Sequence, residues 1–134
     1  MIEKLSVASS RRKEMIDITH IVQEAVGRAG LVDGLCCLWV PHTTAGITVN
    51  EGADPDVQAD VLRTLSRLVP ASGEYAHAEG NSDAHVQSIL TGPGVTIPVD
   101  AGRLCLGTWQ KIFFCEYDGP RRREVWLRFL KQEY

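Results

Sequence analysis

The stretch PHTTAGITVNEGADPD, residues 41–56, separates a dense apolar run from a strong helix start. Upstream, residues 31–40 are apolar without a helical period, which predicts a central strand fed by a turn at Asp33-Gly34. Downstream, Asp54 and Pro55 are a typical N-cap and first helical residue. Polar side chains between a buried strand and a helix indicate a candidate site.

Two helices can be delimited from their patterns. The helix from Thr19, which we expect to be the cap, has apolar residues at spacings of three and four and is ended by Gly30. The helix from Asp54 is expected to stop before Pro70. Its expected buried stripe consists of Val57, Val61, Leu65 and Leu68.

Short alternating apolar segments predict strands, and a third helix is expected over residues 83–90, capped by Asn81 or Ser82. The expected strands cover residues 2–8, 13–18, 46–49, 95–99, 109–117 and 125–130. The sum is one compact α+β domain over residues 1–134. We expect a mostly antiparallel or mixed, sandwich-like β-sheet and about three helices.

Composition narrows the classes of partner. The 134 residues are 44% hydrophobic and 23% charged with a net charge of -3, which is typical of a soluble globular protein and gives no electrostatic case for nucleic acid. No segment is long and apolar enough for a membrane span. The four cysteines lack CxxC spacing and sit in apolar runs, so we expect reduced, buried thiols in a cytoplasmic protein.

Three histidines lie near carboxylates. His42 is in the opening stretch, and His77 and His85 flank AEGNSDA. Three imidazoles with an open fourth position form a common catalytic zinc site, and neighbouring carboxylates orient such rings. The alternative is one histidine packed in the core and two facing solvent. Spacing alone does not decide between them.

Carboxylates and an arginine supply further candidates. Glu51 and Asp83 are candidate general bases or partners of metal ligands, although helix-dipole preference alone largely explains Asp83. Arg121 follows the Asp118-Gly119-Pro120 turn and can bind phosphate bidentately. A solvated turn arginine is the competing interpretation.

A set of motifs in a fixed order gives a family resemblance. They are His42-Thr43-Thr44-Ala45, Asn50-Glu51, Asp54-Pro55-Asp56, His77, Gly80-Asn81-Ser82-Asp83-Ala84-His85, Gly107-Thr108-Trp109-Gln110 and Asp118-Gly119-Pro120-Arg121. Together they closely resemble the YjbQ-like family, also called secondary thiamine-phosphate synthase, over about residues 5–129. Ser82 departs from the family pattern, where alanine is more usual, but it has no expected ligand role.

The resemblance implies a compact α+β domain that forms a homotrimer, with a metal site at His42, His77 and His85. The implied reaction joins a hydroxymethylpyrimidine diphosphate to a thiazole phosphate with loss of pyrophosphate. In this interpretation Thr43, Thr44, Asn81 and Arg121 hold phosphate oxygens, and the partner is a small phosphorylated metabolite.

The identity of the metal bears on the reaction. Mg²⁺, the usual ion for displacing pyrophosphate, prefers oxygen ligands, whereas three histidines favour zinc. We therefore expect a divalent metal, zinc before Mg²⁺, and thiamine-phosphate synthesis as a side activity. The alternatives are a metal-dependent hydrolase of a phosphorylated or amide metabolite, a trimeric small-anion binding module, and a trimer in which the polar cluster only secures the subunit interface.

Overall fold

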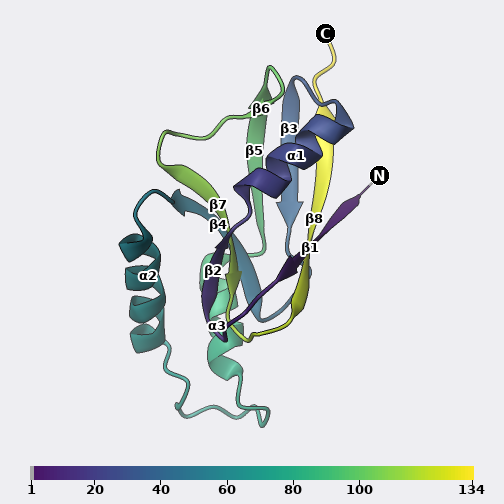
Figure 1. Cartoon of the computed structure of the whole chain (residues 1–134). Helices are drawn as coiled ribbons and strands as arrows, with labels where there is room; N and C mark the ends of the chain where they lie inside the picture. The colour runs from purple at the N-terminus through teal and green to yellow at the C-terminus, as the bar shows by residue number, and fades with distance from the viewer. Residues whose placement is uncertain (1) are drawn as a thin grey trace.

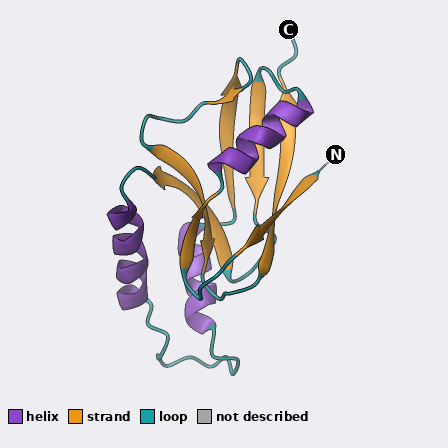
Figure 2. Cartoon of the chain, in the orientation of Figure 1, coloured by secondary structure: helices purple, strands orange, loops and turns teal. Residues whose placement is uncertain are grey.

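Two antiparallel sheets and three helices make up the chain (Figures 1 and 2). The computed structural model describes residues 2–134, so Met1 of the expected domain lies outside the described residues. The strands are β1 (Glu3–Ala8), β2 (Glu14–Asp17), β3 (Gly34–Trp39), β4 (Ala45–Glu51), β5 (Gly94–Asp100), β6 (Arg103–Leu104), β7 (Gln110–Glu116) and β8 (Arg122–Lys131). The helices are α1 (Thr19–Ala29), α2 (Pro55–Leu68) and α3 (Ser82–Thr91). The expected α+β class with mostly antiparallel sheet is confirmed.

The apolar run before Pro41 forms β3, the central strand of the five-stranded sheet, whose order is β1-β8-β3-β5-β6. Cys36 of β3 pairs with Phe129 of β8 and Ile97 of β5. Alternate residues of β3 point to opposite faces, so Cys36 and Leu38 are buried while Trp39 is 52% exposed. One face of this sheet therefore forms the main core, and the other is open to solvent.

Strand β7 is the centre of the three-stranded sheet, between β2 and β4. Phe114 points into the main core, where it pairs in register with Ile16 and Ile47. Phe113 and Cys115 point to the opposite face and form a second, smaller core with Ala84 of α3. This sheet is thus covered on one side by the rest of the main core and on the other by α2 and α3.

Helix α1 lies across the five-stranded sheet (Figure 1) and buries Val22, Ala25 and Val26. Gly30 ends it in the left-handed region at φ 67°, as the sequence predicts. The expected cap at Thr19 is wrong. Its hydroxyl instead accepts a hydrogen bond from the Ile112 amide at 2.8 Å, because the helix start packs against β7.

Helix α2 begins as predicted, with Asp54 accepting a hydrogen bond from the Asp56 amide at 2.9 Å. The expectation of a buried stripe is wrong, because no residue of α2 is buried and Leu68 is 69% exposed. The reason is geometric. The three-stranded sheet offers α2 and α3 a narrow face, and in Figure 1 α2 stands at its side rather than over its middle.

The cysteines follow the prediction only in part. All four are free thiols; Cys36 and Cys115 are buried, but Cys105 is exposed. Burial raises the pKa of Cys36 and of Cys115 to about 12, which keeps both thiols neutral and unreactive. Within residues 2–134 no helix has both the length and the hydrophobicity needed to cross a bilayer.

Candidate functional site

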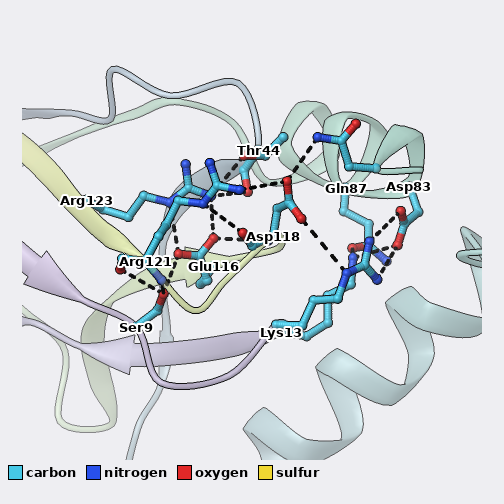
Figure 3. A network of polar contacts seen from close by, with 11 residues as sticks. Ser9, Lys13, Thr44, Asp83, Gln87, Glu116, Asp118, Arg121 and Arg123 are labelled. Atoms are coloured by element: carbon cyan, nitrogen blue, oxygen red, sulfur yellow. Dashed lines mark hydrogen bonds and ion pairs between the residues drawn. The ribbon is translucent and has the colours of Figure 1, made fainter. Parts of the chain in front are cut away.

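A buried ion pair joins β7 to β8 and contacts Thr44 of residues 41–56 (Figure 3). Glu116 and Arg123 are 0% and 3% exposed, and Arg123 Nε donates to Glu116 Oε1 at 2.9 Å. Ser9 also donates its hydroxyl to Glu116, at 2.7 Å. Burial alone would raise the pKa of Glu116, but the hydrogen bonds from Arg123 and Ser9 outweigh it and lower that pKa. Glu116 is therefore a charged partner of Arg123 at neutral pH.

The same arginine fixes the stretch after His42. Arg123 Nη2 donates to the Thr44 hydroxyl at 2.9 Å and lies 3.2 Å from its carbonyl oxygen. Thr44 is 5% exposed, so it anchors Arg123 instead of presenting a hydroxyl to a phosphate in solution. Thr43, the other predicted hydroxyl, is exposed. The threonine pair thus divides into one internal and one external residue, as expected for neighbours in an extended segment.

A second ionic cluster ties α3 to the start of β2 (Figure 3). Asp83 is 1% exposed and accepts from Lys13 at 2.8 Å and from Arg12 at 3.0 and 3.2 Å. Burial would raise the pKa of Asp83, but hydrogen bonds from both cations hold it below its ordinary value. Lys13 also donates to Gln87 at 2.6 Å. A carboxylate so paired is a weak base, so its geometry suits anchoring α3 better than general-base catalysis.

Asp118 lies between the two clusters (Figure 3). It accepts from Asn81 Nδ2 at 3.0 Å and from Arg121 Nη2 at 3.1 Å. Asn81 Oδ1 is buried and has no hydrogen-bond partner within residues 2–134. An unpaired buried acceptor costs free energy, so it indicates a position at which a ligand donor is needed.

His77 and His85 meet beside this junction. Their ring centroids are 5.5 Å apart at an interplanar angle of 86°, and Glu79 Oε2 lies 3.7 Å from His77 Nε2. Asn81 is the N-cap of α3, and the His85 amide, one turn later, lies 3.3 Å from the Asn81 carbonyl. We call the hydrogen-bonded set Asn81, Asp118 and Arg121, together with the histidine pair that begins one helical turn after it, the α3 junction.

His42 lies between β3 and β4, within reach of the charges of Arg123 and Glu116. Its Nε2 accepts a hydrogen bond from the Glu124 amide at 2.9 Å, and its ring packs edge-on against Phe114 at 6.5 Å. Burial, and next the charge of Arg123, lower the pKa of His42. The ring is therefore neutral with its proton on Nδ1, so neither nitrogen has a lone pair free for a metal in this conformation.

The fit to a metal can be judged from these placements. Two imidazoles on one tetrahedral zinc, with Zn–N distances of about 2.0–2.1 Å, would have centroids about 5 Å apart, so His77 and His85 suit two positions. No group of three or more His, Cys, Asp or Glu side chains within residues 2–134 is placed to hold one ion. The expected convergence of three histidines is thus not found inside a single described chain.

Glu51 is separated from the α3 junction. Glu51 is the last residue of β4, and the first residue, Ala45, directly follows Thr44. Roughly 20 Å of strand therefore separates Glu51 from Thr44. The Glu51 carboxylate accepts from the Asp54 amide at 3.0 Å, and its carbonyl accepts from Gln58, which fixes the start of α2. Glu51 therefore belongs to the α2 side of the three-stranded sheet.

Sequence reasoning missed the charged residues that hold the junction together. They are Arg12, Lys13, Glu116, Asp118 and Arg123. Glu116 carries one usable signal, because it follows the apolar run Ile112–Cys115 inside a strand, where a charge must be paired. Arg12 and Lys13 carry none, because a basic turn is ordinarily solvated.

Comparisons with known proteins agree with this fold. A family model described as "UPF0047 protein YjbQ-like" matches residues 3–132. The chain is 46% identical to UPF0047 protein MJ1081 of Methanocaldococcus jannaschii, covering 97% of this chain and 94% of that protein. It is 44% identical to UPF0047 protein YugU of Bacillus subtilis, covering 97% and 99%.

Solved structures give the same answer. A YjbQ/UPF0047 family protein from Clostridium acetobutylicum superposes with a TM-score of 0.93 at 46% identity, covering 96% of this chain and 99% of that one. The hypothetical protein APE1520 from Aeropyrum pernix superposes with a TM-score of 0.93 at 39% identity, covering 98% and 99%. With this fold and these matches over almost its whole length, the chain belongs to the UPF0047, or YjbQ-like, family.

Proposed function

We propose that this protein is an enzyme that binds a small phosphorylated metabolite at the α3 junction. The transfer reaction attributed to secondary thiamine-phosphate synthase is the first candidate. The observation that carries the proposal is the buried, unpartnered Oδ1 of Asn81, whose amide group shares Asp118 with Arg121 and which lies one helical turn before His85. An acceptor, cations and titratable rings in one place suit a ligand with both donor and anionic groups.

Arg121 is the phosphate-binding residue of the proposal. Its Nε and Nη2 donate to Asp118 at 2.9 and 3.1 Å, and half of its side chain remains exposed. Asp118 therefore holds one edge of the guanidinium in place while the rest of the side chain stays exposed. Holding the group in place reduces the entropy lost when a phosphate binds. His85 and His77 are placed to exchange a proton with the bound molecule or to orient it.

We expect Arg121→Ala to raise the KM for the phosphorylated substrate by about 10–100-fold, since one charge-assisted contact is worth roughly 1.5–3 kcal/mol. The assay follows thiamine phosphate formed from the pyrimidine diphosphate and the thiazole phosphate. Arg122→Ala is the matched control, because Arg122 is the exposed neighbour at the start of β8. Equal KM values in both variants would remove Arg121 from the site.

The same preparations separate the alternative functions. Release of phosphate or amine from phosphate esters or amides, without joined product, would identify a hydrolase. Tight binding with no product at high enzyme concentration would identify a binding module. Full turnover at ordinary rates with Mg²⁺ as the added metal would contradict our proposal that thiamine-phosphate synthesis is a side activity.

A divalent metal, zinc before Mg²⁺, is part of the proposal, with His77 and His85 as its ligands. Such an ion supplies a Lewis acid for a phosphate oxygen. We expect His85→Ala to weaken zinc binding at least about tenfold, and His42→Ala to retain it. Elemental analysis after dialysis against zinc measures both. Metal loss in His42→Ala alone would restore His42 as the main ligand.

We also propose a homotrimer in a reducing, cytoplasmic environment. Four free thiols support the environment. The open face of the five-stranded sheet supports self-association, because a cavity of about 650 Å³ there is lined by Trp39 and Trp126, and Leu130 nearby is 50% exposed.

We therefore expect Trp39→Asp to convert the trimer to single chains, because a charge would have to be desolvated at the apolar contact. Light scattering after size-exclusion chromatography measures the mass. Leu68→Asp is the control, since Leu68 is 69% exposed on α2. A trimer that survives Trp39→Asp but not Leu68→Asp would move the interface to α2.

A further inference from the structure

A second cavity lies away from the α3 junction, between α2 and the outer face of the three-stranded sheet. It is a half-open pocket of about 220 Å³. Protein interiors rarely leave voids larger than a water molecule, whose share of liquid volume is about 30 Å³. An engineered apolar cavity of about 150 Å³ holds benzene. This space therefore has room for one six-membered ring with two or three small substituents.

The walls of the cavity are apolar, and one of them is helix α2. Val57, Val61 and Leu65 of α2 face Met15 of β2, and Leu90 of α3 also lines the space. No residue of α2 is buried, although its apolar side points this way. Leu62 and Leu65 of α2 pack partly against the second core, whereas Val57 and Val61 leave apolar surface that a bound ring would cover.

The floor is polar but uncharged. The Tyr117 hydroxyl is paired with Thr91 Oγ1, and Cys115 lies beside it. Burial raises the pKa of both Tyr117 and Cys115, so neither ionises near neutral pH. The floor therefore offers weak hydrogen bonding and no charge to an incoming ligand.

The rim carries the one charged group of the lining. Asn50 is exposed, Glu51 is half-buried beside it, and Gln58 completes the edge. The Asp54 amide holds one oxygen of Glu51 in place at 3.0 Å. The described lining contains no Lys, Arg or His, and Lys13, whose Nζ lies 5.7 Å from the centroid of the Tyr117 ring, is paired with Asp83, so a phosphate or carboxylate would meet the negative charge of Glu51 at the rim.

We propose that this cavity is a binding site for a single-ring, neutral or singly cationic aromatic or heterocyclic molecule, with an N–H or O–H donor directed at Glu51. The apolar walls take the ring, and the Glu51 carboxylate accepts from the donor. None of these residues belongs to the α3 junction, so this site stands or falls independently of the proposed function.

Three probes of one shape and different charge test the proposal: benzylamine, benzyl alcohol and benzoate. Methyl-labelled protein is titrated by NMR. We expect saturable shifts confined to methyls of Val57, Val61, Leu65 and Leu90 for the amine and the alcohol, with benzoate at least tenfold weaker. Equal binding of benzoate, or shifts spread over the surface, would overturn the charge or the location of the site.

Variants then assign the contacts. Glu51→Gln should weaken benzylamine about fivefold to tenfold and leave benzyl alcohol within twofold, because it removes one partly exposed charge. Val61→Trp should fill the space and abolish binding of both, whereas Leu68→Trp, on the exposed side of the same helix, should leave binding intact. Val57→Phe is a second filling variant should Val61→Trp unfold α2. Unchanged binding in a folded filling variant would show that the cavity is not the site.

Discussion

Replacing Arg123 by alanine is expected to lower the free energy of unfolding by about 3–5 kcal/mol, because it leaves Glu116 buried and without its cation. Thr44 loses its donor in the same change, so the segment after His42 should loosen. Urea unfolding at pH 7 measures the loss. Arg122→Ala, one residue away and exposed, should change stability by no more than about 0.5 kcal/mol.

The pH dependence provides an independent check on this ion pair. In the wild-type protein the pKa of Glu116 is lowered, so its contribution to stability is present above the unfolded value of about 4.3 and is lost as pH falls through the folded value. In Arg123→Ala we expect burial to outweigh the remaining hydrogen bonds from Ser9 and the Asp118 amide and to raise that pKa. The variant should therefore gain stability as pH falls from 7 towards 5, while the wild type does not. The same slope in both proteins would contradict the assignment.

The double replacement Glu116→Leu with Arg123→Met separates the ion pair from its packing. Removing both charges avoids an uncompensated carboxylate, so the double variant should be more stable than Arg123→Ala. If it is equally unstable, packing around the site rather than the buried charge explains the loss.

Replacing Asp83 by alanine is expected to cost about 2–3 kcal/mol and to displace the start of α3. Lys13 and Arg12 would lose their common partner, although both remain partly exposed, which keeps the cost below that of a fully buried charge. Asp56→Ala is the control, because Asp56 is an exposed acidic residue in the first turn of α2. Urea unfolding measures stability, and ¹⁵N shifts of residues 81–85 report the position of α3.

Asp83→Asn distinguishes anchoring from general-base catalysis. An amide keeps the shape but turns an NH2 donor towards Lys13 or Arg12, so an anchor should lose stability while the folded variant keeps its activity. A general base would lose activity by about 10²–10⁴-fold while the fold stays intact. We expect the first outcome, because Asp83 is 1% exposed and fully occupied by the two cations.

Much of the fold follows from local sequence patterns. The apolar run before Pro41 could be assigned as a central strand because a dense apolar run suits a strand that is paired on both sides. In the structure β3 lies between β8 and β5. The start of α2 at Asp54-Pro55 and the end of α1 at Gly30 are set by local backbone chemistry. Both could be recognised without any tertiary contact.

The burial of α2 could not be read in the same way. An apolar stripe shows that a helix has a face to cover, but it does not show what covers it. Here only part of the stripe meets a packed core: Leu65 packs against the second core, while Val57 and Val61 face a space of about 220 Å³. Cys105 is a second example, because it lies in an apolar segment of the sequence and yet its side chain is exposed.

The candidate site was predicted in its parts and not in its arrangement. The sequence by itself determined the family and the α+β class, because these depend on residue types in order along the chain. Only the tertiary structure decided that His77 and His85 meet while His42 accepts from the Glu124 amide. It also decided that Thr44 and Asp83 are held by Arg123, Arg12 and Lys13. The physical reason is that an ion pair or a metal site depends on distances across the fold, and those distances are set by sheet register and packing rather than by spacing in the sequence.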